Sequence, residues 1–341
     1  MGKLVWGSRE GDELETRRLW FRQLQKELGL PTPEYTVIRG ITNLRAFLKD
    51  HGHCFVKATC KIRGSMETWE HFDIEQSEYH LDKLAVKLGG GKEQVQFMVE
   101  EPIDAEFETG FDTYCIDGQF SAVPIQGIEV KGKLILCSAQ TKSKTPDFID
   151  EAMGALSPIL KEFRYRNFVS GEFRNEILND PCCRAPNPGI GCEMEMIKNL
   201  GEVILAGANG ELVEPEYEFE FGIQAAIFHD HEEDLWKQFR IPAELRRWIK
   251  LMEFCQVGEP YNIIPRPPHG QKIGWVVGVG HTIEEAAAHL QANTKELKEI
   301  HVEVKIEALE EAVKQARQAE SEGVEFTHQD IPDPETILQD A

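Results

Sequence analysis

The chain has 341 residues, enough for two domains and for a sizeable hydrophobic core without disulfides or metals. Its 37 Lys and Arg residues against 59 Asp and Glu residues give a formal net charge of −22. This acidity argues against proteins that wrap duplex nucleic acid or bind anionic membranes, because both kinds of protein need clustered basic residues.

The chain has no apolar run of the ~20 residues that span a bilayer, and its first residues lack the apolar stretch of a secretory signal. Its 8 cysteines include no C-x-x-C pair, so we expect reduced thiols and not a disulfide framework. We therefore expect a cytoplasmic protein.

Residues 13–92 predict a first α/β unit. Helical periodicity over residues 13–28 ends at Gly29, where a C-terminal cap belongs. Apolar and polar residues alternate over residues 54–61, which predicts a strand with Lys57 on one face. The other predicted elements are a strand at 35–38, a helix at 43–50 capped by Thr42, a turn at 63–65 and a helix at 77–88.

Strand patterns dominate residues 93–225, the second expected unit. Asp117-Gly118 is the strongest hairpin signal in the chain. The predicted strands are 95–99, 107–116, 119–125, 130–139, 166–174 and 176–180, and the predicted helices are 148–163 and 191–207.

Residues 226–341 predict a C-terminal α/β portion. Thr282 and Glu285 have the spacing of a capping box at a helix start. The other expected features are helical or mixed structure at 225–235 and 243–254, a Pro-rich loop at 261–270, a strand at 272–279, a long charged helix at 295–322 and a loose tail after Gly323. No early strand is followed by G-x-G-x-x-G, so we expect an α+β fold and not a doubly wound sheet.

Two segments contain groups that suit phosphate. Lys57 could contact a phosphate as a point charge, although a lysine in a strand usually points to solvent. The turn Arg63-Gly64-Ser65 could surround a phosphate with backbone N–H groups and a hydroxyl, although an ordinary turn is the simpler interpretation.

Carboxylates characterise two further segments. Glu100 and Glu101 follow an apolar strand and would suit the ribose of a nucleotide, or they are solvated acids at a strand end. Alternation places Glu106, Glu108 and Asp112 on one strand face, where they repel unless they are solvated or meet cations.

The fifth segment combines acids with an arginine. Glu172 and Asp180 lie at the ends of adjacent predicted strands and offer the oxygen ligands that Mg²⁺ prefers. Arg184 lies nearby and could hold a phosphate or a carboxylate. Taken alone, this segment is more simply interpreted as a surface ion-pair cluster.

Taken in order, the five segments resemble the ATP-grasp family over roughly residues 13–290. The shared order is a nucleotide lysine, a glycine turn, a hinge with paired glutamates, an acidic strand and a metal-binding pair ending in arginine. The segment Gly280-His281-Thr282-x-Glu284-Glu285-Ala286 is similar to a late helix start in carboxylate–amine ligases of this superfamily. The nearest group is the phosphoribosylamine–glycine ligase-like proteins, including those often carried by bacteriophages. The resemblance implies a two-lobed ATP-grasp fold with antiparallel sheets.

The resemblance also implies roles for single residues. Those expected at the nucleotide are Lys57, Gly64, Ser65, Glu100, Glu101 and Glu108, and those expected to act in catalysis are Arg63 and Arg184. Glu172 and Asp180 would hold Mg²⁺. The family's metal phrase, Glu-x-Asn-x-Arg, here contains Asp180, Cys182 and Arg184. Because cysteine is a poor ligand for Mg²⁺, the number of bound metals stays open.

The implied cofactors are ATP and Mg²⁺, and the implied partners are a small carboxylate and an amine joined through an acyl phosphate. A degenerate ATP-binding or regulatory module is the main alternative, and Cys182 favours it. The acidic surface would suit an interaction protein. A metal-dependent hydrolase would use Glu172 and Asp180 with His229 and His231, although a solvated H-x-H is the simpler interpretation. The oligomeric state stays open.

Overall fold

The computed structural model describes residues 4–59, 68–105, 108–139, 145–229, 235–265, 272–297 and 302–338. Within these ranges the chain forms three β-sheets, of four, ten and three strands, and their strand pairs are antiparallel. Helices and antiparallel strands mix along the chain, so the predicted α+β class is confirmed. None of the described helices is long and apolar enough to cross a membrane.

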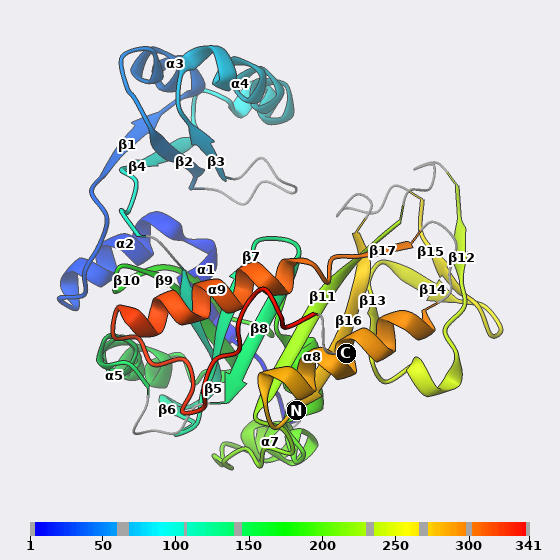
Figure 1. The fold of residues 1–341 in the computed structure, drawn as a ribbon. Helices are drawn as coiled ribbons and strands as arrows, with labels where there is room; N and C mark the ends of the chain where they lie inside the picture. The colour runs from blue at the N-terminus through cyan, green and yellow to red at the C-terminus, as the bar shows by residue number, and fades with distance from the viewer. Residues whose placement is uncertain are drawn as a thin grey trace.

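A small lobe contains the four-stranded sheet, in the order β1-β4-β2-β3, and two helices that cover one face of it (Figure 1). Its elements are β1 (Tyr35–Arg39), α3 (Ile41–Lys49), β2 (Cys54–Ala58), β3 (Thr68–His71), α4 (Ile74–Leu88), η2 (Gly89–Gly91) and β4 (Gln96–Glu100). Alternation in β2 buries Cys54, Val56 and Ala58 in the core under these helices. Lys57 consequently lies on the other face of the sheet, as predicted.

A large lobe is built on the ten-stranded sheet. Its main path is β10 (Ile177–Cys182), β9 (Arg166–Arg174), β5 (Thr109–Ile116), β7 (Ile125–Val130), β8 (Leu134–Ala139), β11 (Phe221–His229), β16 (Lys272–Gly280) and β13 (Ile249–Leu251). Two short strands complete it: β6 (Gln119–Phe120), which pairs with β5, and β17 (Val302–Val304), which pairs with β11. The three-stranded sheet joins β12 (Lys237–Phe239), β15 (Tyr261–Ile263) and β14 (Phe254–Gln256).

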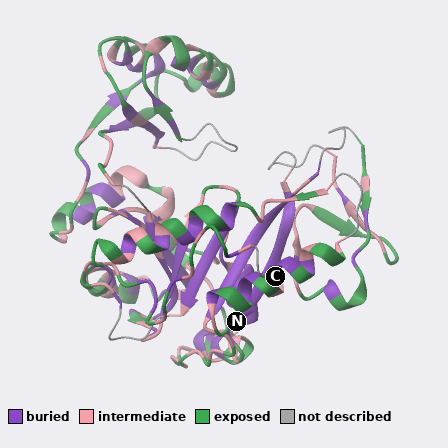
Figure 2. Cartoon of the chain, in the orientation of Figure 1, coloured by how far each residue is buried: buried purple, intermediate pink, exposed green. Residues whose placement is uncertain are grey.

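Helices pack on both faces of the large sheet, and its central strands are buried (Figure 2). The helices on the first face are α2 (Arg18–Glu27), α5 (Asp147–Glu162), α8 (Ile283–Glu296) and α9 (Ala308–Ser321). Those on the second face are α6 (Ile190–Met196) and α7 (Leu200–Asn209). The remaining helical elements are α1 (Glu13–Thr16), η1 (Arg9–Asp12) and η3 (Ala243–Leu245). The acidic residues of β5, β7 and β9 lie on the second face.

Most predicted elements are present, and the exceptions have physical causes. Residues 225–229, expected to be helical or mixed, instead belong to the central strand β11 (Phe221–His229), because a strand buried on both faces shows an apolar run without alternation. The predicted capping box is confirmed, since the Thr282 hydroxyl accepts from Glu285 N at 3.1 Å. Thr42, by contrast, is not a cap: it lies inside α3, and its hydroxyl donates to Glu93 at 2.8 Å.

The C-terminal residues are more ordered than predicted. The charged helix expected at 295–322 is shorter, since α9 covers only Ala308–Ser321 and the strand β17 precedes it. The segment after Gly323 packs on the large sheet and buries Phe326, Ile331 and Ile337. The isolated apolar residues of this segment show no periodicity, so the sequence did not reveal their burial.

The expected domain boundaries do not coincide with the sheets. The strand β4 follows residue 93 but completes the small sheet, and β11 crosses the boundary expected at 225/226. The helix expected to start the first lobe packs on the large lobe, through Leu14, Phe21 and Leu24. The large sheet therefore combines the two units that the sequence separated.

Candidate nucleotide and metal site

Five carboxylates lie on one face of the large sheet near the small lobe. In strand register, Asp180 on β10 pairs with Glu172 on β9, and Glu172 pairs with Gly110 on β5. Paired residues point to the same face of a sheet, as do residues two apart in a strand. The face therefore gathers Glu108, Asp112, Glu129, Glu172 and Asp180, which all line one cavity of about 270 Å³. Glu129 was not predicted from the sequence, whereas the shared face of Glu108 and Asp112 is confirmed; Glu106 lies outside the described residues.

A second cavity, of about 200 Å³, lies between the two lobes and is called here the interlobe cavity. The small lobe lines it with Phe55, Lys57, Thr68, Glu100 and Glu101. The large lobe lines it with Glu108, Lys131, Glu172, Arg174, Asn179 and Asp180. The two cavities share Glu108, Glu172 and Asp180, so the described residues among those predicted for the nucleotide lie in one region with the pair predicted for the metal.

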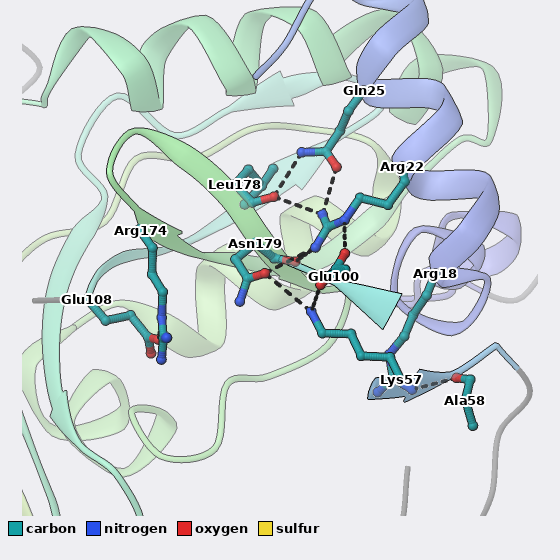
Figure 3. Close-up of polar contacts among 10 residues, drawn as sticks. All are labelled: Arg18, Arg22, Gln25, Lys57, Ala58, Glu100, Glu108, Arg174, Leu178 and Asn179. Atoms are coloured by element: carbon teal, nitrogen blue, oxygen red, sulfur yellow. Dashed lines mark hydrogen bonds and ion pairs between the residues drawn. The ribbon is translucent and has the colours of Figure 1, made fainter. Parts of the chain in front are cut away.

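Lys57 belongs to a buried ion network that joins the lobes (Figure 3). Its ammonium lies 2.6 Å from one oxygen of Glu100, and Arg22 Nε lies 2.6 Å from the other. Asn179 Oδ1 accepts from Lys57 at 3.3 Å and from Arg22 at 3.1 Å. Burial acts to raise the pKa of Glu100, but Lys57 and Arg22 together hold it below the ordinary value. Glu100 therefore stays ionised and fixes the direction of Lys57.

The paired glutamates of the hinge have different environments. Glu100 lines the interlobe cavity, but cations engage both of its carboxylate oxygens. The side chain of Glu101 is 54% exposed, and His51 Nε2 lies 3.1 Å from it. Glu101 thus remains the more accessible carboxylate. Arg22 was not selected from the sequence, where its only signal was that Arg22 and Gln25 are polar residues within an apolar helix face.

Glu172 and Asp180 provide two carboxylates that fit a magnesium ion. They are direct partners across the β9–β10 hairpin, and Mg²⁺ prefers oxygen ligands. Burial, followed by the negative charge of Glu108, raises the pKa of Glu172 to about 7. Cys182 does not fit, because burial raises the pKa of its thiol to about 11 and keeps it neutral. The donor set is therefore two carboxylates without the third ligand of the family's phrase.

Lys131 lies among three of the carboxylates. Its ammonium is 2.8 Å from Glu108, 3.1 Å from Glu172 and 3.4 Å from Glu129. Glu108 also accepts from Arg174 Nε at 2.7 Å. Burial opposes ionisation of Glu108, but the two cations lower its pKa. The sequence did not indicate Lys131, because it follows a strand with ordinary alternation.

Arg184 lines the larger cavity, with a side chain that is 57% exposed. Its Nε donates to Glu15 at 3.0 Å, and the other oxygen of Glu15 accepts from Cys183 N at 3.0 Å. Arg184 is therefore held at the cavity edge by the first helix of the large lobe.

The other predicted residues lie away from this region or outside the described structure. Arg63, Gly64 and Ser65 lie outside the described residues, as does His231. His229 is buried in β11, which β7 and β8 separate from β5. Of the two histidines that the hydrolase alternative requires, the structure describes His229, and that residue lies away from Glu172 and Asp180.

Several solved structures have a similar fold. Phosphoribosylamine–glycine ligase of Thermotoga maritima matches with a TM-score of 0.69 and 16% identity, over 88% of this chain and 79% of that chain. A second match is the biotin carboxylase domain of Hydrogenobacter thermophilus 2-oxoglutarate carboxylase, solved with ADP, magnesium and bicarbonate. Its TM-score is 0.64 at 14% identity, and the match covers 100% of this chain and 78% of that chain. An L-amino acid ligase of Bacillus licheniformis matches with a TM-score of 0.54 and 18% identity, over 86% of this chain and 73% of that chain.

No protein-family model and no curated protein sequence matches the chain. At these identities the structural matches define the fold alone. The predicted two-lobed ATP-grasp fold is confirmed.

Proposed function

We propose that this chain is an ATP- and Mg²⁺-dependent ligase that joins a carboxylate to an amine through an acyl phosphate. The observation that carries the proposal is the interlobe cavity, where Lys57 of the small lobe faces Glu172 and Asp180 of the large lobe. The fold adds support, because the similar structures include ligases and an enzyme solved with ADP and magnesium. Among them is the group that the sequence resembled most, the phosphoribosylamine–glycine ligases.

The proposed reaction begins when an oxygen of the substrate carboxylate attacks the γ-phosphorus of ATP. The bond to the β-phosphate oxygen breaks, so that ADP leaves and an acyl phosphate forms. The amine then attacks the acyl carbon, phosphate leaves, and the amine nitrogen loses a proton. Such a transfer depends on positioning and on charge stabilisation, so the protein needs no covalent nucleophile.

Each residue of the site has a separate role in the proposed reaction. Lys57, fixed by Glu100, would contact the phosphates as a point charge. Arg184 would stabilise charge on the acyl phosphate from the edge of the larger cavity. Glu172 and Asp180 would hold Mg²⁺, which neutralises phosphate charge when bound. Glu101, the exposed acid of the hinge, suits the ribose hydroxyls.

A second candidate function is an ATP-binding module without ligase activity. Cys182 favours it, because the missing oxygen ligand weakens the metal site. Such a module would bind Mg-ATP but would not release ADP when carboxylates and amines are added.

Thermal unfolding with and without Mg-ATP tests the proposed site. A ligand at about 100 times its Kd adds roughly 2.7 kcal/mol of stability. We expect a Mg²⁺-dependent rise in Tm for the native chain, a smaller rise for Asp180→Asn and a native rise for Glu176→Gln, an exposed acid of the same hairpin. Absence of any shift in the native chain would overturn the proposal. ADP release with mixed carboxylates and amines then separates the ligase from the binding module.

A further inference from the structure

Asn179 is the extra residue of a β-bulge in strand β10. Leu178 of β10 pairs with Phe173 of β9. The next pair joins Asp180 to Glu172, so Asn179 has no partner of its own on β9. Consecutive side chains of a regular strand point to opposite faces, whereas a bulge re-aims one of them. Asn179 and Asp180 accordingly both line the interlobe cavity.

Two cations fix the orientation of the Asn179 amide. Its oxygen accepts from Lys57 Nζ at 3.3 Å and from Arg22 Nη2 at 3.1 Å. The amide nitrogen cannot accept from a cation, so the opposite orientation of the amide is excluded. In Figure 3 the contacts of this side chain end on its oxygen, and none ends on its nitrogen. Lys57 and Arg22 thus hold the amide so that its N–H groups are left for another acceptor.

The Nδ2 group of Asn179 is a donor without a protein partner. It carries two N–H groups, and within the described residues it donates to no protein acceptor. Convergent polar groups that line a cavity fix the orientation of a ligand there. The amide does not replace the metal ligand that is missing at Cys182, because its oxygen is already shared by two cations. Its nitrogen is therefore the part of the side chain that is available to a ligand.

We propose that Asn179 is a nucleotide-binding residue whose Nδ2 group donates a hydrogen bond to the polyphosphate of ATP beside Lys57. The inference rests on the proposed function and adds a residue to its site. A nucleotide whose phosphates contact Lys57, and whose metal ion is held by Glu172 and Asp180, passes Asn179 on the way. Phosphate oxygens are charged acceptors, which form stronger hydrogen bonds than neutral ones.

Two substitutions at this position isolate the contribution of the donor. Asn179→Asp keeps an oxygen for Lys57 and Arg22, loses the N–H groups and adds a negative charge. Asn179→Leu is similar in size and neutral, but it loses the oxygen together with the N–H groups. Only the loss of the donor is common to both variants.

Isothermal titration with ADP and with the non-hydrolysable analogue AMP-PNP, each at saturating Mg²⁺, tests the proposal. We expect both variants to raise the two Kd values at least about tenfold, as for the loss of a hydrogen bond to a charged group. Asn175→Asp is the control: it adds the same charge in the exposed turn of the same hairpin, outside the interlobe cavity. It should change the Kd values less than about twofold. Unchanged nucleotide affinity in either Asn179 variant would overturn the proposal.

Unfolding of the same variants in denaturant separates ligand binding from a purely structural role. Asn179→Asp should be at least as stable as the native chain, because its carboxylate can pair with both cations. Asn179→Leu should be less stable, because it removes an acceptor from two buried cations. If only the less stable variant binds nucleotide weakly, Asn179 acts through the packing of the lobes and the proposal is wrong.

The native chain separates this inference from the proposed function. If it binds ADP and AMP-PNP and the Asn179 variants bind them equally well, the inference alone is overturned. If the native chain binds neither nucleotide, the proposed function and the inference both fail.

Discussion

Two carboxyl groups of the acidic face have pKa values above the ordinary range. Burial raises the pKa of Asp112 to about 7, with further contributions from Glu172 and Glu129. The pKa of Glu172 is raised to about 7 by burial and by Glu108. In the unfolded chain these carboxyl groups lose their protons near pH 4. Between about pH 4 and pH 7 the folded chain therefore binds more protons than the unfolded chain does. The stability that these groups contribute is present below that window and is lost as the pH rises through it.

Asp112→Asn should remove part of this pH dependence, because asparagine imitates the protonated acid. We expect the native chain to lose more free energy of unfolding between pH 5 and pH 8 than the variant does. Urea unfolding at the two pH values measures the difference. The exposed Asp104→Asn is the control, and equal losses in the native chain and in Asp112→Asn would contradict the expectation.

Cys182→Asn should strengthen Mg²⁺ binding at the Glu172–Asp180 pair. The substitution replaces a neutral thiol with the amide oxygen found in the family's phrase, and Mg²⁺ prefers oxygen. We expect the Kd for Mg²⁺, measured calorimetrically with ADP present, to fall at least about threefold. Cys182→Ala removes the thiol without adding a ligand, and an equal gain in both variants would argue against coordination.

Arg184→Ala should reduce turnover far more than nucleotide affinity. Loss of one group that stabilises transition-state charge typically costs about 100-fold in kcat. We expect that loss with little change in the Kd for ATP, measured by steady-state ADP release and by calorimetry. Parallel losses in kcat and ATP affinity would instead assign Arg184 to ground-state binding.

At the scale of elements, helix α2 connects the two lobes. Arg18 donates to the carbonyl of Ala58 in β2 at 3.1 Å, and Arg22 binds Glu100 of β4 (Figure 3). The same Arg22 donates to the carbonyl of Asn179 in β10 at 2.7 Å. One helix thus fixes two strands of the small lobe relative to the hairpin that carries Asp180. This arrangement keeps Lys57 opposite the acidic face.

Arg22→Met should therefore destabilise the chain by about 3 kcal/mol, because it leaves a buried carboxylate with one cation fewer. Arg17→Met, just before α2 and exposed, removes a surface pair with Glu13 and a cation–π contact with Trp20, and should cost about 1 kcal/mol. Chemical denaturation of both variants gives the comparison. A similar cost for both would mean that the network contributes nothing beyond a surface ion pair.

At the scale of the whole molecule, the C-terminal segment completes the core of the large lobe. Phe326, Ile331 and Ile337 join the apolar cluster between the large sheet and helices α8 and α9. The cluster also contains residues of β7, β8, β11 and β16, so segments far apart in sequence share one core. The part of the chain predicted to be loose therefore contributes to the stability of the lobe that bears the acidic face.

Phe326→Ala should lower the free energy of unfolding by about 4 kcal/mol, as expected for a fully buried phenylalanine. Phe254→Ala, in the three-stranded sheet and 42% exposed, should cost less than about 1 kcal/mol. Equilibrium unfolding in denaturant compares the two. Equal costs would show that the C-terminal segment does not depend on Phe326 for its packing.

The sequence by itself determined the local features of this protein. Alternation in β2 indicated that Lys57 faces away from the apolar core, and the spacing of Glu108 and Asp112 placed both on one face. The capping box at Thr282 and the position of Glu172 and Asp180 on adjacent strands were likewise readable from spacing, whereas the direct pairing of these two acids depends on a register shift between Leu178 and Asp180. These features depend on neighbours within one strand, one helix turn or one hairpin, where the backbone geometry fixes which side chains meet.

Only the tertiary structure decided which distant residues meet. Arg22 and Glu100 are 78 residues apart, Lys131 and Glu172 are 41 apart, and Arg184 and Glu15 are 169 apart. Their contacts follow from strand order in the large sheet and from the packing of α1 and α2, which no local periodicity encodes. The charges that set the pKa values of the acidic face come from separate strands for the same reason. Several residues of the candidate site could therefore be selected from the sequence, whereas Glu129, Lys131 and the ion pairs could not, because they depend on long-range packing.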